Sequence, residues 1–281
     1  MKLNDLKSIF YKRLQMFDNN ECQTMFKQLC ASYLDLDPID IVLNDSLKIP
    51  REDQNKFELA IEKLQANEPL QYILGQSYFF GLELKLTPSV LIPRPETEEL
   101  VAWILEHFES SDAPKILDLG TGSGCIAISL AKHLPKAEVH ALDVSSEALE
   151  IAQKNAQAHG VQVVFHQQDM TKIKTFDTDF DVIVSNPPYV CQKEKTQMKA
   201  NVLHYEPHLA LFVDDNTPLK FYQFIKRIAT RHLKPDGLAF MEINEAYGTE
   251  MVQLFEEKRF KKTNLKNDTF GKPRMLKTIK K

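Results

Sequence analysis

The stretch DVIVSNPPYV, residues 181–190, decides the fold of this chain, because an apolar run leads straight into an Asn-Pro-Pro-Tyr turn. Val182, Ile183 and Val184 are β-branched, which favours a central parallel strand covered on both faces. Pro187 has no N–H to donate to a neighbouring strand, so the ladder ends there. The sequence therefore predicts a buried strand whose carboxyl end carries the turn, at the edge where open α/β sheets bind ligands.

The residue types of the turn indicate a binding site for an amino group. A residue before a proline is kept out of the helical region, so Asn186 and Pro187 are both held extended. The side-chain oxygen of Asn186 and the backbone carbonyl of Pro187 then provide two acceptors, which can hold both hydrogens of an –NH2 group. Tyr189 can lie flat against the planar group that carries the amine. The alternative interpretation is a proline-stiffened turn that only caps the strand.

Strand and helix patterns alternate from Lys115 onward, which predicts βα units and a largely parallel sheet. Strands are expected at about 115–119, 138–143, 161–166, 181–185, 238–243, 261–266 and 274–279. Helices are expected at about 124–133, 146–159, 218–233 and 247–258. A further helix starts near Pro95, where several acids suit a helix N-terminus.

Residues 1–74 show a different pattern, a run of short helices. Apolar residues recur there at helical spacing, and Pro38 and Pro50 fit the starts of helices. Residues 75–90 change to the alternation of a β-hairpin, which is expected to join the two parts. The sequence thus predicts a small all-helical domain at 1–74 and an α/β domain at 75–281 that begins with the hairpin.

The bulk composition limits the class of protein. With 281 residues and 43% hydrophobic content, the chain can form one large domain or two of ordinary size. No stretch approaches the roughly 18 apolar residues of a membrane span, so we expect a cytoplasmic protein without a membrane partner. The formal net charge of −4 argues against a stable nucleic-acid partner, because phosphate neutralisation needs a basic surface. The four cysteines lack metal-ligand spacing, so no metal site is expected.

A second group of polar and glycine residues follows the first three strands of the expected sheet. The first strand, KILDLG, runs into a loop in which glycines let the backbone come close to a ligand. The loop consists of Gly120, Thr121, Gly122, Ser123 and Gly124. Its G-x-G-x-G spacing differs from the G-x-G-x-x-G of a dinucleotide cradle, and a tight strand-to-helix turn is the alternative.

Two acids complete this group. Asp143 ends the second strand, where a carboxylate can accept bonds from both hydroxyls of a ribose. Asp169 follows the third strand, and Met170 beside it can pack on an adenine ring. Each acid alone also fits a helix cap or a loop position. Together with the glycine loop and the turn at 186–189, however, they favour a ligand site at neighbouring strand ends.

The set DLGTGSG, Asp143, Asp169 and NPPY resembles the class I S-adenosylmethionine-dependent methyltransferases that methylate planar amino groups. Within that class, the helical N-terminus, the hairpin and LIPRPETEEL resemble the peptide chain release factor glutamine methyltransferase family, with further matches in EPLQYILG, YEPHLAL and FGKPR. The resemblance implies a Rossmann-like, seven-stranded, mostly parallel sheet with a reversed last strand. It also implies S-adenosylmethionine as cofactor. The acceptor would be the glutamine side-chain nitrogen in the Gly-Gly-Gln loop of class I release factors, whose methylation modulates translation termination.

Carried over residue by residue, the resemblance implies both site assignments. Cofactor contacts fall on Gly120, Thr121, Gly122, Ser123, Gly124, Asp143, Asp169, Met170 and Asn186. The glutamine site falls on Asn186, Pro187, Pro188 and Tyr189, of which Asn186, Pro187 and Tyr189 carry the catalysis. We expect a monomer that has class I release factors as partners and uses its helical domain for docking. Two alternatives stay open: a methyltransferase acting on an exocyclic amine of a nucleic-acid base, and a binding module that docks on a translation factor without catalysis.

Overall fold

The structure is a computed structural model that describes residues 1–173, 175–256 and 258–281. The chain divides into two compact units. The first, which we call the helical unit, comprises Met1–Gly75 and Lys199–Tyr205. The second, the sheet unit, comprises Gln76–Met198 and Glu206–Lys281. A short segment from the second half of the sequence thus belongs to the helical unit.

The helical unit is a set of short helices around an aromatic core. Phe10, Phe26 and Phe57 are buried at its centre. Asp18 caps the second helix, because its Oδ1 accepts hydrogen bonds from the backbone N–H groups of Asn20 and Glu21 at 2.8 and 2.9 Å. The helices are α1 Leu3–Arg13, α2 Asn19–Leu34, α3 Pro38–Leu43, α4 Arg51–Gln65, α5 Leu70–Leu74 and α9 Ala200–Tyr205.

The sheet unit contains a seven-stranded sheet with the order β10-β11-β9-β6-β3-β4-β5. Its strands are β3 Lys115–Leu119, β4 Glu138–Asp143, β5 Val164–Gln167, β6 Phe180–Ser185, β9 Leu233–Glu242, β10 Phe260–Asn267 and β11 Pro273–Lys280. The pairs among β5, β4, β3, β6 and β9 are parallel, whereas β11 is antiparallel to both of its neighbours. The predicted Rossmann-like sheet with a reversed last strand is confirmed.

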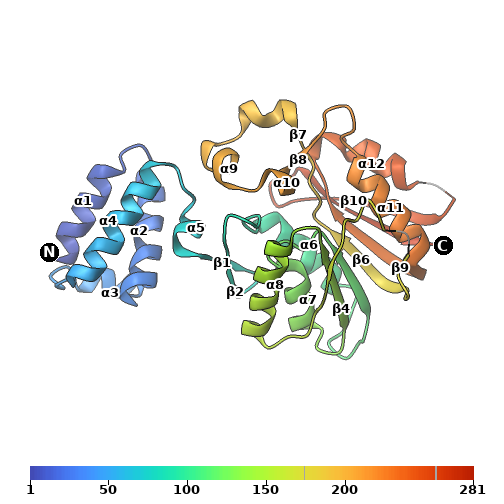
Figure 1. The fold of residues 1–281 in the computed structure, drawn as a ribbon, viewed down its shortest axis with the longest axis horizontal. Coiled ribbons are helices and arrows are strands. Elements are labelled where there is room, and N and C mark those ends of the chain that lie inside the picture. Colours follow the sequence, from blue (N-terminus) through green and yellow to red (C-terminus); the bar gives the residue numbers. More distant parts are fainter. Residues whose placement is uncertain (174, 257) are drawn as a thin grey trace. The chain divides into compact units, whose positions relative to one another are not determined.

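Helices cover both faces of this sheet (Figure 1). One face packs against α6 Pro95–Leu105, α7 Cys125–His133 and α8 Ser146–His159, and the other against α11 Lys220–His232 and α12 Gly248–Phe255. In the central strand β6, Val182 and Val184 belong to the first core and Ile183 to the second, and all three are fully buried. Each such side chain stabilises the fold by about 1.5–3 kcal/mol relative to an exposed one. The predicted strand covered on both faces is confirmed.

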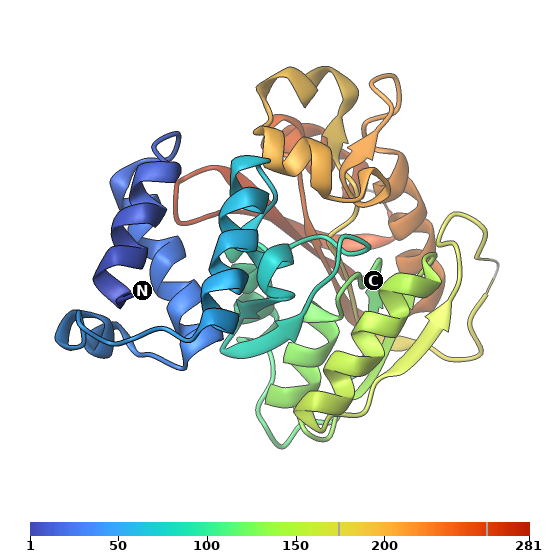
Figure 2. The same ribbon diagram turned by 60° about the vertical axis from the view of Figure 1, so that its left-hand side comes forward.

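The predicted hairpin consists of β1 Gln76–Phe79 and β2 Leu82–Lys85. Its two-residue turn places Phe80 and Gly81 at φ values of 49° and 75°, the arrangement that matches the twist of paired strands. Glu98 in the first turn of α6 holds this turn, since its Oε1 accepts the Phe80 N–H at 2.7 Å. Figure 2 shows the hairpin in teal next to the green helices of the same unit.

Some element boundaries differ from the sequence prediction. Strand β5 begins at Val164 and not at 161, because the N–H of Val161 bonds back to Ala156 and completes the cap of α8. Strand β9 begins earlier than expected, and α12 ends at Phe255, short of the expected 258; Glu257 lies outside the described residues. The prediction did not include β7 Val190–Cys191, β8 Phe212–Val213, α9, α10 His208–Leu211 and the 3-10 helices Gln192–Gln197 and Glu245–Tyr247.

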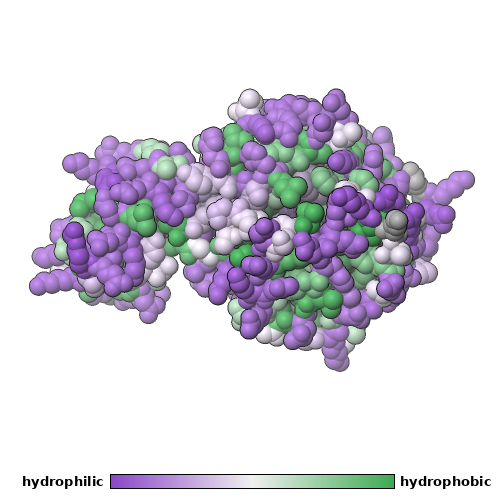
Figure 3. All heavy atoms as spheres, viewed as in Figure 1, coloured by the Kyte–Doolittle hydropathy of each residue, from purple (hydrophilic) through white to green (hydrophobic). Residues whose placement is uncertain are grey.

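The surface is consistent with the composition. On the face shown in Figure 3, hydrophilic side chains predominate and apolar patches lie between them. Within the described ranges, no helix combines the length and the apolar character needed to cross a membrane.

Candidate active site

A cavity of about 440 Å³ lies in the sheet unit at the carboxyl ends of β3, β4, β5 and β6. Its volume falls within the usual range for small-molecule sites. The predicted site residues that line it are Gly120, Thr121, Gly122, Ser123, Asp143, Asp169, Met170, Asn186 and Pro188. Gly124, Pro187 and Tyr189 adjoin these residues in the chain but are not among the described residues that line the cavity. The fold thus brings the ends of four strands to one place.

Backbone conformation explains the glycines of the loop after β3. Gly120, Gly122 and Gly124 have φ values of 78°, 56° and 84°, which L-residues with side chains adopt at a cost. A Cβ on Gly124 would lie 2.7 Å from Ile128 Cδ1 and 3.1 Å from Ala152 Cβ. Gly124 is therefore required for the close approach of α7 and α8, whereas a Cβ on Gly122 would meet no described atom within 4 Å.

A buried asparagine, which the sequence analysis missed, holds this loop. Asn155 in α8 donates through Nδ2 to the backbone oxygens of Ser123 at 2.9 Å and Lys85 at 3.1 Å. Its Oδ1 accepts the Lys85 N–H at 2.8 Å. The side chain thus joins the glycine loop to the hairpin strand β2. No local signal marks it, because Asn155 sits inside an ordinary helical pattern.

Asp143 and Asp169 lie where the sequence predicted, and both bond to nearby backbone. Asp143 accepts N–H bonds from Gly122 at 2.9 Å and Ser145 at 3.0 Å, one on each oxygen. Each carboxylate oxygen has a second lone pair, so Asp143 retains capacity for ligand hydroxyls. Hydrogen bonds from Thr171 lower the pKa of Asp169 below its ordinary value, which keeps this carboxyl ionised.

Beneath the loop lies a further acid, Asp118 of β3, which is completely buried. Its Oδ2 accepts the Thr121 hydroxyl at 2.7 Å, while its Oδ1 has no hydrogen-bond partner among the residues that the structure describes. Burial raises the pKa of Asp118 to about 7. The support of the glycine loop therefore includes a carboxyl group that changes its charge near neutral pH.

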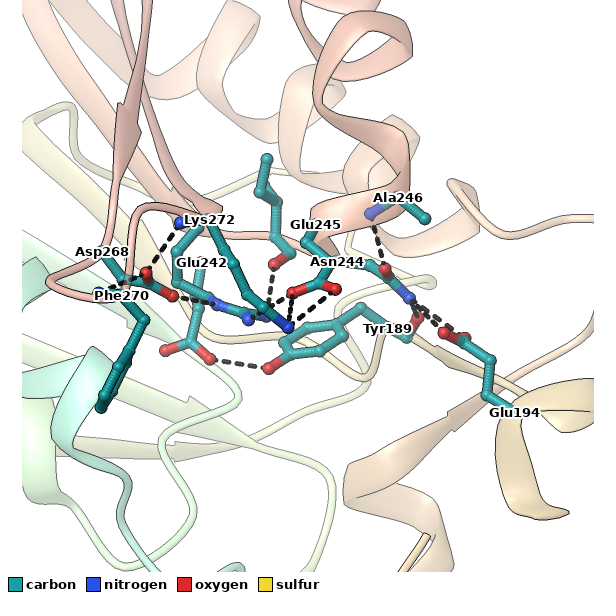
Figure 4. A network of polar contacts seen from close by, with 11 residues as sticks. Tyr189, Glu194, Glu242, Asn244, Glu245, Ala246, Asp268, Phe270 and Lys272 are labelled. Carbon is teal, nitrogen blue, oxygen red and sulfur yellow. Dashed lines mark hydrogen bonds and ion pairs between the residues drawn. The ribbon is translucent and has the colours of Figure 1, made fainter. Parts of the chain in front are cut away.

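The Asn186 amide connects to the core through two residues that the sequence analysis did not assign. Its Nδ2 donates to Thr97 Oγ1 at 3.1 Å, and Thr97 Oγ1 donates to Glu242 Oε2 at 2.6 Å. The hydroxyl of Tyr189 donates to Glu242 Oε1 at 2.8 Å (Figure 4). Glu242, at the end of β9, is almost fully buried, and burial raises its pKa. The sequence did offer a signal for Glu242, because it is an acid at the end of the apolar run LAFME.

An ion pair joins two of the motifs quoted above. Arg94 of LIPRPETE pairs with Glu206 of YEPHLAL, and Glu206 also accepts the Ile92 N–H at 3.3 Å. Both segments supply lining residues, Leu91 and Leu209 among them. The motifs therefore form one wall of the cavity, although they are more than a hundred residues apart.

Comparisons with known proteins agree with this geometry. The family described as Methyltransferase small domain matches residues 99–209, and the PrmC N-terminal domain matches residues 11–75. The release factor glutamine methyltransferase of Flavobacterium psychrophilum is 45% identical over 99% of both chains, and that of Bacteroides thetaiotaomicron is 44% identical over 98% of this chain and 99% of its own. A methyltransferase from Pyrococcus furiosus shares the fold, with a TM-score of 0.52 and 20% identity over 81% of this chain and 98% of that one. Similarity at this level along the whole length shows that the chain belongs to the release factor glutamine methyltransferase family.

Proposed function

We propose that this protein transfers a methyl group from S-adenosylmethionine to the side-chain nitrogen of the glutamine in the Gly-Gly-Gln loop of class I release factors. Such methylation modulates translation termination. One observation carries the proposal: the acceptor side chain of Asn186 lines the same cavity as the glycine loop and Asp143. The names of the relatives supply the class of substrate.

The residues of the cavity fit S-adenosylmethionine. Gly122 leaves open space where a side chain would stand, so a ligand can approach the backbone. Asp143 offers oxygen acceptors to ribose hydroxyls, and buried Met170 offers an apolar surface to an adenine ring. When bound, the cofactor supplies a methyl group on a sulfonium, which is already a good electrophile. The main task of the protein is therefore to orient the acceptor nitrogen.

Asn186 and Pro187 perform this orientation in the proposed mechanism. The lone pair of an amide nitrogen is delocalised into its carbonyl, so alignment of the nitrogen contributes much of the rate. Methylation forms a carbon–nitrogen bond, breaks the carbon–sulfur bond and releases one amide proton to solvent. Acceptors at Asn186 Oδ1 and the Pro187 carbonyl hold the two amide hydrogens and stabilise the positive charge that develops on the nitrogen. The stacking of Tyr189 on the substrate amide stays a prediction.

We further propose that the helical unit supplies part of the docking surface for the release factor. Ile39, Val42 and Leu43 of α3 are each at least 70% exposed, and their apolar side chains suit a protein partner. The protein would act as a monomer in the cytoplasm, where termination takes place. The alternative substrate, an exocyclic amine of a nucleic-acid base, is disfavoured by the net charge of −4 and by the names of the relatives.

The test is methylation of a purified class I release factor with labelled S-adenosylmethionine, followed by mapping of the modified residue. We expect one label, on the glutamine of the Gly-Gly-Gln loop. Asn186→Ala should lower kcat on the order of a hundredfold with little change in cofactor affinity, as for other single transition-state hydrogen bonds. Asn186→Asp keeps an acceptor and should retain part of the activity. A wild-type kcat for Asn186→Ala would refute the amide clamp, and label only on nucleic acid would refute the proposed substrate.

A further inference from the structure

The direction of the Asn186 amide is a separate requirement of the proposed mechanism. An asparagine side chain presents an acceptor oxygen on one side and an –NH2 donor on the other. Only the oxygen can accept a hydrogen from the substrate amide. The prolines that follow Asn186 restrict its backbone, but they do not select which end of its side chain faces the cavity. Another group must make that selection.

A chain of hydrogen bonds that ends at Glu242 selects which end of the Asn186 side chain faces the cavity. A carboxylate has acceptors and no donor, so the hydroxyl proton of Thr97 is committed to Glu242 Oε2 at 2.6 Å. Thr97 can then only accept from the amide of Asn186. Accordingly Nδ2 of Asn186 lies 3.1 Å from Thr97 Oγ1, and Oδ1 of Asn186 is the end left for the cavity. Because the carboxylate can only accept, it fixes the direction of both hydrogen bonds, from Thr97 to Glu242 and from Asn186 to Thr97.

The surroundings of Glu242 hold the carboxylate in place. Thr97 of α6 is 2% exposed and Glu242 is 1% exposed, so water does not compete for this contact. The hydroxyl of Tyr189 donates to the second carboxylate oxygen at 2.8 Å, and Tyr222 of α11 donates to the backbone oxygen of Glu242 at 3.0 Å. Burial raises the pKa of Glu242, while the hydrogen bonds from Thr97 and Tyr189 and the nearby positive charge of Arg274 of β11 oppose this rise and favour the ionised form.

Arg274 is itself held by two further acids. Its Nε donates to Asp268 at 3.3 Å, and its Nη2 donates to Glu245 at 3.1 Å. Figure 4 shows Asp268 and Glu245 in one polar network with Tyr189 and Glu242. These bonds hold the positive charge of Arg274 near Glu242, at the opposite end of the hydrogen-bond chain from Asn186.

We propose that Thr97 and Glu242 are positioning residues, which orient the Asn186 amide so that its oxygen is presented to the substrate glutamine. This inference rests on the proposed function and adds the two residues that set the acceptor. Neither residue acts on the substrate directly. Thr97 acts through the amide of Asn186, and Glu242 acts through the hydroxyl of Thr97.

Substitutions at Thr97 and Glu242 separate the effect of hydrogen-bond direction from the effect of side-chain shape. Thr97→Ser keeps the hydroxyl, whereas Thr97→Val keeps the branched shape and removes it. Glu242→Gln keeps the shape but introduces an –NH2 donor, which can bond to Thr97 and free its hydroxyl to donate to Asn186. The Asn186 amide can then turn, and a donor faces the substrate.

The experiment measures single-turnover methylation of a class I release factor at saturating S-adenosylmethionine. We expect Thr97→Val and Glu242→Gln to lower the rate at least about tenfold, the effect of one lost hydrogen bond. Thr97→Ser should stay within about threefold of wild type, and the cofactor affinity of all three variants should stay within about threefold. Thr278→Val is the matched control, because it removes another buried threonine hydroxyl bond, 3.1 Å to Thr263, away from the cavity. It should leave the rate unchanged.

A double-mutant cycle excludes a merely structural effect. If Thr97 acts through Asn186, Thr97→Val should cost no further activity in the Asn186→Ala background, whereas damage to the fold would cost the same in both. Equal losses in both backgrounds, or a wild-type rate for Thr97→Val, would overturn the inference. A wild-type enzyme that does not methylate the release factor would instead overturn the proposed function, so the two failures are distinguishable.

Discussion

Three glycine-to-alanine variants separate the two tasks that we propose for the glycine loop, which are to permit packing and to admit the cofactor. Gly124, Gly122 and Gly160 all have positive φ values, of 84°, 56° and 65°. An alanine at any of them costs about 1–2 kcal/mol of backbone strain. Gly160 caps α8 and is not among the described residues that line the cavity, so Gly160→Ala measures strain alone.

The expected losses differ because the surroundings of the three positions differ. A Cβ at position 124 would meet Ile128 at 2.7 Å and Ala152 at 3.1 Å, and such overpacking adds about 1–3 kcal/mol to the strain. We therefore expect Gly124→Ala to lose about 2–5 kcal/mol of unfolding free energy. Gly122→Ala and Gly160→Ala should each lose about 1–2 kcal/mol, since a Cβ there meets no described atom within 4 Å.

Cofactor affinity then separates Gly122 from Gly160. Gly122 lines the cavity and has open space beside it, so we expect a methyl group there to occupy room that S-adenosylmethionine needs. Gly122→Ala should weaken binding at least about tenfold, about 1.4 kcal/mol, and Gly160→Ala should leave it unchanged. Urea denaturation measures stability, and calorimetric titration measures affinity. Equal stabilities for Gly124→Ala and Gly160→Ala, or unchanged affinity for Gly122→Ala, would refute the reasoning.

Three further predictions test other parts of the protein. Asp143→Ala should weaken S-adenosylmethionine binding by about 1.5–3 kcal/mol, the scale of a lost charged hydrogen bond, and Asp143→Asn by less; unchanged affinity in calorimetry would contradict the ribose assignment. Because burial raises the pKa of Asp118 to about 7, the folded state holds a proton that the unfolded state, with a pKa of about 3.9, has released. Wild-type stability should therefore fall relative to Asp118→Asn as pH rises from about 4 to about 7, and a constant difference in urea denaturation over that range would exclude it. The double variant Val42→Asp, Leu43→Asp should raise KM for the release factor while cofactor affinity stays unchanged; an unaltered KM would remove α3 from the docking surface.

Local sequence was sufficient to predict the elements that form the proposed cofactor site. Strand β6 followed from a β-branched run ended by proline, and the loop after β3 followed from three glycines that each take a positive φ. These features depend on neighbours in the chain, so they were visible without the fold. The predicted start of β5 was wrong because the N–H of Val161 bonds to Ala156 in the cap of α8, and this hydrogen bond competes with strand pairing.

The support of the site depends on contacts between distant segments, and there the sequence was insufficient. Thr97 is 89 residues from Asn186 and 145 from Glu242, and only the packing of α6 across the ends of β6 and β9 brings them together. Asn155 is a similar case, since it joins the hairpin to the glycine loop. Glu242 was visible as an acid at the end of an apolar run, but Thr97 and Asn155 carried no local signal, and none of their partners could be read from the sequence.

The Asn-Pro-Pro-Tyr turn shows how the two levels combine. Its prolines fix the backbone locally, as the sequence predicted, but its two polar side chains are both directed to one buried carboxylate. Asn186 reaches Glu242 through Thr97, and the Tyr189 hydroxyl reaches it directly. The sequence interpretation gave the hydroxyl of Tyr189 no role, whereas the structure gives it a buried partner whose loss leaves a carboxylate oxygen with one donor fewer. Proline therefore restricts the backbone of the turn, and Glu242 orients its side chains. We expect a substitution of Glu242, at the end of β9, to impair the Asn-Pro-Pro-Tyr motif more than fifty residues away, although the motif itself is unchanged.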